Sequence, residues 1–210
     1  MNIIPVTQGS PEWLQARLGI PTASCFEKIV TATGKPSTQA DTYLYQLLAE
    51  WLTGKPHESF TNEWMDRGTA LEPEARAYFE MTEDCEVQQV GFCTTDDGLM
   101  GCSPDMLIGT DGGGEIKCPS GGVHVQYLME NAIPSKYIPQ VQGSMYVTGR
   151  KWWKWLSYHP DMPPVIVRVE RDAAWHKSFD GIMRGFLAKM AGLRRELIEK
   201  GHTPKLAEAA

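Results

Sequence analysis

The stretch GCSPDMLIGTDGGGEIKCP, residues 101–119, contains two carboxylates and an amine around a Gly-rich segment. The β-prone runs LMGCSPDML and GGEIKC flank this segment as in an antiparallel hairpin, and Thr110–Gly114 is predicted as the turn between them. The hairpin would bring Asp105, near the end of one strand, close to Glu115 on the next. Because residues two apart on a strand share a face, Glu115 and Lys117 are predicted to point the same way.

These three side chains predict a metal site. Two carboxylates that close repel each other unless a cation lies between them, and hard oxygen ligands suit Mg²⁺ or Mn²⁺. The backbone carbonyl of Ile116 can add another oxygen. Lys117 would then orient or deprotonate a water, the latter only if its surroundings lower its pKa. This set of groups is what phosphodiester hydrolysis requires.

The alternative interpretation is three solvated charges beside a turn. The chain itself contains a comparison for the pattern. Pro160–Asp161 is also followed by an acidic residue, Glu170, but the residue two positions later is Asp172. The second Pro-Asp pair therefore lacks the amine, and only the first carries the complete set.

Length and composition indicate one globular domain, 1–210. The chain has 210 residues, 42% of them hydrophobic, and lacks both a secretory signal pattern and an apolar run long enough to span a membrane. Five cysteines without a C-x-x-C pair argue against structural zinc, an iron–sulfur cluster and a disulfide framework. A reducing cytoplasm fits this cysteine usage.

The net charge of −6 is unevenly distributed along the chain. Residues 1–116 hold 6 Lys and Arg against 18 Asp and Glu, whereas residues 117–210 hold 14 against 8. Such asymmetry can leave a basic surface on an acidic protein, and a solvated basic helix is the equally good alternative.

The order of predicted elements favours an α/β fold. Helices are predicted at 11–18, at 42–53 with Asp41 as its cap, at 62–81, near 121–131, at 137–149 and at 173–200. Short strands forming an antiparallel meander begin at Glu86, and the runs WWKWLSYH and VIVRVER are the last two strands. A mixed central sheet flanked by helices follows from this order. The tail, 201–210, is predicted to be disordered.

Several motifs together resemble the phage lambda-type exonuclease family, a branch of the restriction-endonuclease-like PD-(D/E)xK nucleases. The pair SPD and EIK looks like the nuclease signature. The segments that resemble the family run in order along the chain: EWLQARLGIPTAS, RGTALEPEAR, GCSPDML, EIKCP and PQVQGSMYVTGRKWW. Five matches in register cover most of the chain, and they imply a restriction-endonuclease-like core.

Carried over to these positions, the resemblance implies a role for each residue. Asp105, Glu115 and the carbonyl of Ile116 would bind one metal, Glu72 would help to complete a second metal position, and Lys117 would position the attacking water. Glu74 lies about 200° around a helix from Glu72, so only one of the two is expected to face the site.

The resemblance also implies a pocket for the 5′-phosphate of a DNA end. The residues at the matching positions are Arg17, Ser24, Ser103 and Gln142. Arg17 offers a planar, always-charged fork to a phosphate, and the others offer hydroxyl and amide donors. Trp13 matches the aromatic residue of the strand-separating wedge, and it is predicted to share a helix face with Arg17. Loop residues between 31 and 41 match the family poorly, and Lys35 is only a candidate there.

The resemblance implies a Mg²⁺-dependent deoxyribonuclease, with Mn²⁺ as a substitute. It would degrade the 5′-phosphorylated strand of linear duplex DNA from 5′ to 3′, release mononucleotides and leave a 3′ overhang for recombination by strand annealing. A homotrimeric ring, a single-strand annealing recombinase as partner, and a phage or prophage origin in a bacterial host are implied as well. Two alternatives stay open: an endonuclease of the same superfamily and a non-catalytic scaffold that binds DNA ends.

Overall fold

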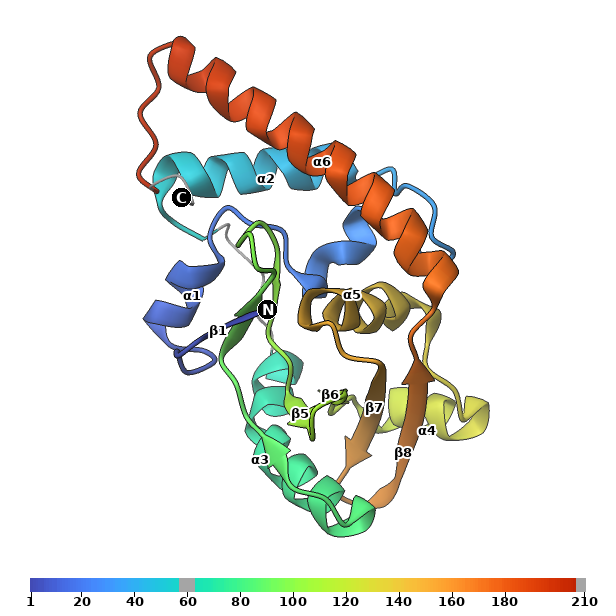
Figure 1. Cartoon of the computed structure of the whole chain (residues 1–210). Helices are drawn as coiled ribbons and strands as arrows, with labels where there is room; N and C mark the ends of the chain where they lie inside the picture. The colour runs from blue at the N-terminus through green and yellow to red at the C-terminus, as the bar shows by residue number, and fades with distance from the viewer. Residues whose placement is uncertain (57–62, 207–210) are drawn as a thin grey trace.

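The computed structural model of the chain describes residues 1–56 and 63–206 (Figure 1). The elements in chain order are β1 (Asn2–Ile4), α1 (Pro11–Arg17), η1 (Ala23–Lys28), α2 (Ala40–Thr53), α3 (Glu63–Glu83), β2 (Val87–Gln88), β3 (Phe92–Thr94), β4 (Gly101–Cys102), β5 (Met106–Ile108), β6 (Gly112–Lys117), α4 (Gly121–Glu130), η2 (Ser135–Tyr137), α5 (Ile138–Thr148), β7 (Trp152–His159), β8 (Met162–Glu170) and α6 (Ala173–Glu199).

The larger sheet has five strands in the order β2-β5-β6-β7-β8. β6 runs parallel to β7, whereas the other neighbours are antiparallel. A parallel pair needs a crossover connection, and α4 and α5 supply it. The predicted mixed sheet flanked by helices is therefore confirmed.

The predicted single meander is wrong. β2 joins the larger sheet beside β5, whereas β3 pairs with β1 and with β4 in a separate sheet of three strands. The run EVQQVGFCTT thus supplies strands to two sheets. The N-terminal strand β1 completes the smaller one, a long-range pairing that local sequence patterns do not reveal.

The glycine run 112–114 is a strand and not a turn. It forms the first half of β6, and the turn is limited to Gly109–Asp111. A β-carbon at Gly112 or Gly113 would lie 2.2 Å from the ring of Trp152 or Trp153 on β7. Only glycine lets the indole rings approach the strand this closely. The predicted turn Thr110–Gly114 is therefore wrong in extent.

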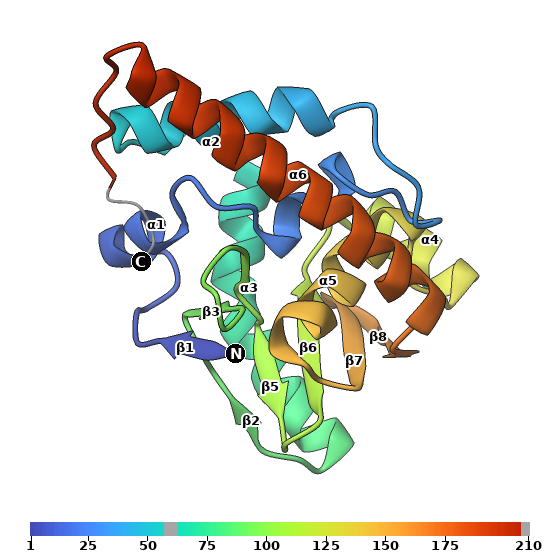
Figure 2. The same cartoon turned by 45° about the horizontal axis from the view of Figure 1, so that its top comes forward.

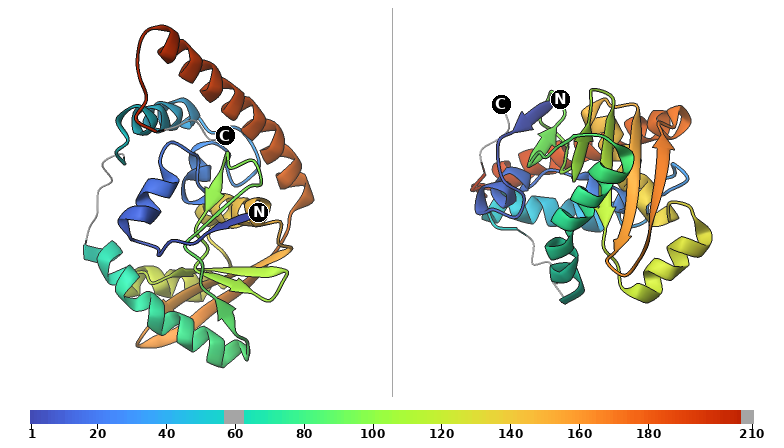
Figure 3. Two further views of the ribbon diagram at one scale, coloured as in Figure 1. Left: turned by 60° about the vertical axis from the view of Figure 1, so that its left-hand side comes forward. Right: turned by 90° about the horizontal axis from the view of Figure 1, so that it is seen from below.

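Helices cover both faces of the larger sheet (Figure 3). On one face, Ala75 and Phe79 of α3 pack against Ile116 and Leu156 in the smaller of two hydrophobic clusters. The other face carries Trp153 and Trp155, both fully buried, in contact with the cluster that α4 and α5 help to build. Both tryptophans therefore belong to the packing between the sheet and its helices.

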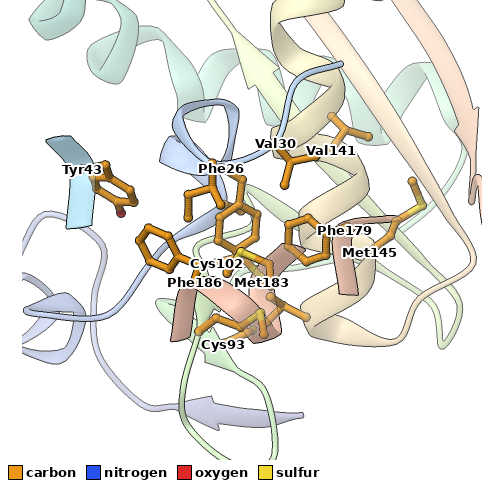
Figure 4. Packing of buried hydrophobic residues seen from close by; sticks show 14 of the residues in the cluster. Phe26, Val30, Tyr43, Cys93, Cys102, Val141, Met145, Phe179, Met183 and Phe186 are labelled. Atoms are coloured by element: carbon orange, nitrogen blue, oxygen red, sulfur yellow. The ribbon is translucent and has the colours of Figure 1, made fainter. Parts of the chain in front are cut away.

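An outer layer of helices closes this second face. α6 lies along α2 and also contacts α5 (Figures 1 and 2). Phe179 and Met183 of α6 meet Phe26 of η1 and Met145 of α5 in the main hydrophobic core (Figure 4). The layer places α1, η1 and the smaller sheet beside the end of the β5–β6 hairpin.

The first two helices begin differently. Ser10 caps α1, because its side chain accepts a hydrogen bond from the N–H of Trp13 at 3.2 Å. Asp41 is not a cap, because α2 begins at Ala40 and the capping position is Gln39. The Asp41 carboxylate instead pairs with Lys189 of α6 at 2.6 Å, so it connects the two outer helices.

The segment after α6 turns back onto α2. The backbone N–H groups of Lys205 and Leu206 donate to the carbonyls of Leu52 and Trp51, at 3.3 Å each. The predicted disorder is therefore wrong for residues 201–206, and residues 207–210 lie outside the described part of the chain. Within the described residues, no helix has the length and apolar character to cross a membrane.

Candidate active site

The β5–β6 hairpin brings the two predicted carboxylates together. Met106 pairs with Gly114 on the antiparallel strand. Asp105, one residue before Met106, therefore lies across from Glu115, one residue after Gly114. Asp105 is 8% exposed and Glu115 4%. The Asp105 carboxylate accepts a hydrogen bond from the backbone N–H of Ile116 at 2.6 Å. This contact fixes the carboxylate just before β5 begins, beside the second half of β6.

Lys117 and Glu115 form an ion pair, Nζ to Oε1, of 2.7 Å. The same Glu115 oxygen accepts a hydrogen bond from the Gln140 amide at 2.5 Å. Lys117 Nζ also lies 5.2 Å from the ring centre of Tyr137, which packs against Trp155. As predicted, Glu115 and Lys117 lie on one face, and η2 and the first turn of α5 cover that face.

Burial and charge repulsion raise the pKa values of Asp105 and Glu72. Burial raises the pKa of Asp105 well above its ordinary value, and the charge of Glu115 raises it further. Burial also raises the pKa of Glu72, against the charge of Arg76. A carboxylate cluster of this kind is stabilised in its charged form by a cation.

Lys117 stays protonated in this arrangement. Burial alone lowers the pKa of its amine, but the charges of Glu115 and Asp105 outweigh burial and raise the pKa above its ordinary value. The condition under which Lys117 deprotonates a water, a lowered pKa, is therefore not met here. Its ammonium is a hydrogen-bond donor that can orient a water or stabilise negative charge.

The structure distinguishes between Glu72 and Glu74. Glu72 lines a cavity together with Asp105 and feels the charges of Glu115 and Lys117. Glu74 points elsewhere and accepts a hydrogen bond from the Tyr158 hydroxyl at 2.5 Å, which raises the pKa of Tyr158 to about 12. α3 continues through Pro73. Glu72 is therefore the one of the pair that lies at the site.

The donor set fits a hard divalent cation. Within the described residues, no three His, Cys, Asp or Glu side chains form a metal-binding group. The predicted set contains two buried carboxylates, the Ile116 carbonyl and the more distant Glu72. All of these donors are oxygens, as Mg²⁺ prefers, and Mg²⁺ sites in nucleotide enzymes use one or two carboxylates with substrate phosphates. The roles of these residues as ligands stay predictions.

A second cluster lies next to Asp105 and combines α1 and η1, which are neighbours in sequence, with Ser103, 86 residues after Arg17. Arg17 of α1 donates to the hydroxyls of Ser103, at 3.4 Å, and Ser24, at 3.2 Å. Its guanidinium lies 4.1 Å from the ring centre of Trp13, as their spacing predicted. The Trp13 indole N–H donates to Ser103 at 2.8 Å. We call Trp13, Arg17, Ser24 and Ser103 the end cluster.

The end cluster has the chemistry of an anion site. Arg17 is half-buried, and burial lowers the pKa of its guanidinium, although an arginine keeps its charge. Among the described residues, its side-chain hydrogen-bond partners are hydroxyl groups, without a carboxylate. A cation held by hydroxyls retains the capacity to bind an anion. Trp13 supports Arg17 with its ring face, and its wedge role stays a prediction.

Gln142 does not belong to the end cluster. It is 3% exposed, and its amide bridges the junction of β8 and α6. The amide nitrogen donates to the carbonyl of Glu170 at 2.9 Å, and the oxygen accepts from the N–H of Asp172 and from the His176 ring. The prediction that Gln142 holds the phosphate is not supported, because its amide is engaged in these structural bonds. Gln140, two residues earlier, reaches the site instead.

Comparisons with known proteins identify the family of the chain. Residues 12–151, well over half of the chain, match the model of the YqaJ-like viral recombinase domain. The chain belongs to this family. A stretch of 62 residues is 39% identical to ExoD of Escherichia coli (strain K12), covering 28% of this chain and 71% of that one.

Solved structures extend the likeness of this YqaJ-like chain to its C-terminal part. LHK-Exo, an alkaline exonuclease from Laribacter hongkongensis, is 31% identical, with a TM-score of 0.76 over 90% of this chain and 99% of that one. Its complex with dAMP gives 32% identity and a TM-score of 0.82, over 91% and 98%. A phage-related exonuclease from Haemophilus somnus 129PT shares the fold at 15% identity, with a TM-score of 0.68 over 85% and 96%. The resemblance to the lambda-type exonuclease family is confirmed.

Proposed function

We propose that this YqaJ-like protein is a Mg²⁺-dependent exonuclease, able to use Mn²⁺, that acts on linear double-stranded DNA. It degrades the 5′-phosphorylated strand from 5′ to 3′, releases mononucleotides and leaves a 3′ single-stranded overhang. Membership in a viral recombinase family that includes alkaline exonucleases supports the nuclease activity. The polarity and the product follow from the lambda-type resemblance.

One observation carries the proposal: the end cluster and the carboxylate cluster share one short segment. Ser103, which accepts from Trp13 and Arg17, lies two residues before Asp105. A terminal phosphate carries nearly two charges at neutral pH, so Arg17 and the two serines can distinguish an end from an internal linkage. A DNA end held there places the first phosphodiester near the carboxylates.

In this proposal each side chain of the site has its own role in hydrolysis. A bound divalent cation would stabilise the charge that develops on the phosphodiester oxygens. Asp105 and Glu115 would hold that cation together with the Ile116 carbonyl, and Glu72 would complete a second position. Lys117, kept protonated by Glu115, would orient the attacking water with its ammonium. Gln140 would fix the Glu115 carboxylate through its amide.

Two partners follow from the same proposal. A homotrimeric ring around the DNA would let a chain with a net charge of −6 hold DNA on basic residues that line its interior. A single-strand annealing recombinase would then receive the 3′ overhang. Both belong to the proposal and rest on the family resemblance.

Digestion of one linear duplex, labelled separately at its 5′ and 3′ ends, tests the proposal. In Mg²⁺ the 5′ label should appear in mononucleotides first, while a covalently closed circle stays intact. Cutting of the circle at the rate of the linear DNA would identify an endonuclease. Binding of ends without any hydrolysis in Mg²⁺ or Mn²⁺ would identify a non-catalytic scaffold.

A further inference from the structure

The Lys117 ammonium needs more than its ion pair to keep one direction. It carries three N–H donors on a flexible four-carbon chain, and Glu115 accepts from it at 2.7 Å. In the part of the chain that the structure describes, Glu115 is its one hydrogen-bond partner. Small movements of the lysine chain would redirect the other donors. A group that orients a water has to be held in place, so the site requires a second restraint on this side chain.

The aromatic ring of Tyr137 provides such a restraint. Lys117 Nζ lies over this ring, 5.2 Å from its centre, and cation–π contacts extend to roughly 6 Å. The contact is stronger where the cation is removed from water, and the Lys117 side chain is 25% exposed. The ring face attracts the ammonium electrostatically and offers no oxygen that would accept a hydrogen bond. It can therefore hold the ammonium without replacing a water as its partner.

Tyr137 is itself fixed by an aromatic group in the core. Its ring packs against Trp155 of β7, with 5.7 Å between ring centres, and Tyr127 of α4 meets the same indole edge-on at 5.2 Å. Trp155 is fully buried and pairs with Glu115 in the parallel register of β6 and β7. Burial and a hydrogen bond with the Tyr137 hydroxyl raise the pKa of Tyr127. Both the ring and the hydroxyl of Tyr137 are thus held by neighbours.

One short segment contacts both members of the ion pair. Tyr137 ends η2, and Gln140 lies three residues later in the first turn of α5. Residues three apart on helical turns lie on one face. Gln140 donates to the Glu115 oxygen that Lys117 also binds. Tyr137 meets the ammonium of the pair, so residues 137–140 restrain the carboxylate and the amine together.

A neighbouring lysine allows the role of the ring to be separated from general effects. Lys136 Nζ lies 4.9 Å from the centre of the Tyr137 ring, on an exposed residue. Loss of Lys136 changes the surroundings of the ring but leaves the ion pair untouched. Tyr137 also packs against the main hydrophobic core, and a residue that only filled space there would affect stability without a specific effect on cleavage.

We propose that Tyr137 is a positioning residue that holds the Lys117 ammonium through the face of its ring, so that the donors not bound to Glu115 keep one direction. The inference rests on the proposed exonuclease function, in which Lys117 orients the attacking water. It assigns the role to the ring of Tyr137 and not to its hydroxyl.

NMR measures the contact itself, without DNA or metal. Protons above the face of an aromatic ring are shielded, so the ε-methylene protons of Lys117 should have upfield shifts in the parent chain. Their signals are identified by their loss in Lys117→Ala. The upfield shift should persist in Tyr137→Phe and disappear in Tyr137→Leu. Ordinary lysine shifts in the parent would overturn the proposal, whatever the nuclease activity.

Cleavage kinetics test the consequence of the contact. Tyr137→Leu should lower kcat for mononucleotide release about tenfold and leave KM for DNA ends within about threefold, because a partly buried cation–π contact contributes about this factor. Tyr137→Phe retains the ring and should keep kcat within about twofold of the parent, and Lys136→Ala within about threefold.

Urea unfolding shows whether each variant is folded. Parental kcat in folded Tyr137→Leu, an equal loss in Tyr137→Phe, or a change in KM alone would contradict the positioning role. If Tyr137→Leu does not fold, the spectra of the parent and of Tyr137→Phe decide. Absence of DNA degradation by the parent would remove the proposed function, whereas the NMR shifts would still show whether Tyr137 holds Lys117.

Discussion

The carboxylate cluster and the end cluster lie side by side but are built differently. Asp105, Glu115 and Lys117 come from one hairpin and are mostly buried. Glu115 and Lys117 form an ion pair of 2.7 Å, and Asp105 accepts from the backbone N–H of Ile116. The end cluster combines α1, η1 and the segment before β5, and Ser24 in it is exposed. Its one cation, Arg17, is held by hydroxyl groups.

The difference indicates which job each cluster can do. A buried, internally paired set of charges holds a fixed geometry, as bond cleavage requires. An accessible cation with neutral partners keeps its charge available for a ligand that arrives and leaves. Damage to the first cluster should therefore lower the rate on every substrate, and damage to the second should change which ends are used.

Loss of the Lys117 ammonium should have the largest effect. Lys117→Ala should slow mononucleotide release in Mg²⁺ by about 10²–10⁴-fold, the range for a group that acts on the reacting atoms. The control is Lys154→Ala, on the neighbouring strand β7. It removes the 2.6 Å pair of Lys154 with Glu83 of α3 and should keep activity within about threefold. An unchanged rate in Lys117→Ala would show that the ammonium has no part in the reaction.

Replacement of Arg17 should alter end selection. Arg17→Ala removes a charged contact of about 1.5–3 kcal/mol, so the preference for 5′-phosphate over 5′-hydroxyl ends should fall about 10- to 100-fold. Rates on the two kinds of end are compared under single-turnover conditions. Arg168→Ala is the matched control, since Arg168 also stacks on a tryptophan, 4.2 Å from the ring centre of Trp152. An equal loss of rate on both kinds of end would show that Arg17 supports the fold and does not recognise the phosphate.

The sequence predicts the carboxylate cluster better than its surroundings for a physical reason. Asp105, Glu115 and Lys117 are close in sequence, and the period of a strand is enough to place two of them on one face. The glycines between them have the local pattern of a turn, because the indole rings that require them belong to β7, about 40 residues later by the chain numbering. Long-range packing of this kind leaves no local signal.

The two glutamines of PQVQ show the same limit on a helix. Residues two apart on a helix lie about 200° around its axis, so Gln140 and Gln142 cannot both face the site. The family resemblance points to Gln142. The packing of α5 decides: Gln140 faces Glu115, and Gln142 faces the β8–α6 junction. The proline near the start of α5 and the short apolar pattern of this helix do not determine how the helix is rotated about its axis.

Substitution of Gln140 and of Gln142 should distinguish a role in the site from a role in the stability of the fold. Gln140→Ala should lower kcat about 10- to 100-fold, the usual effect of removing the partner that orients a ligand, with little change in stability. Gln142→Ala should leave buried groups of Glu170, Asp172 and His176 without partners and destabilise the fold by about 3 kcal/mol. Urea unfolding and single-turnover rates are measured on both variants. A kcat loss in Gln142→Ala with parental stability would reverse the assignment.

His176 gives the smallest predicted effect and probes the junction that Gln142 holds. Its Nε2 donates to the Gln142 oxygen, and within the described residues its Nδ1 is buried without a partner. Burial, with the charge of Arg171, lowers the pKa of His176 to about 4. The unfolded chain binds a proton near pH 6.5 and the folded chain does not, so this contribution to stability is present above pH 6.5 and is lost as the pH falls toward 4.

From these values, the histidine should make the fold about 2 kcal/mol less stable at pH 5 than at pH 7. His176→Gln keeps a donor for Gln142 without a titrating ring, so it should lose less stability than the parent over the same interval. Urea unfolding at the two pH values gives the change in the free energy of unfolding for each chain. The contributions of the other titrating groups cancel when the two changes are subtracted. An identical pH dependence would mean that the folded protein accommodates the charged ring, and the junction would then be less tightly closed than its hydrogen bonds indicate.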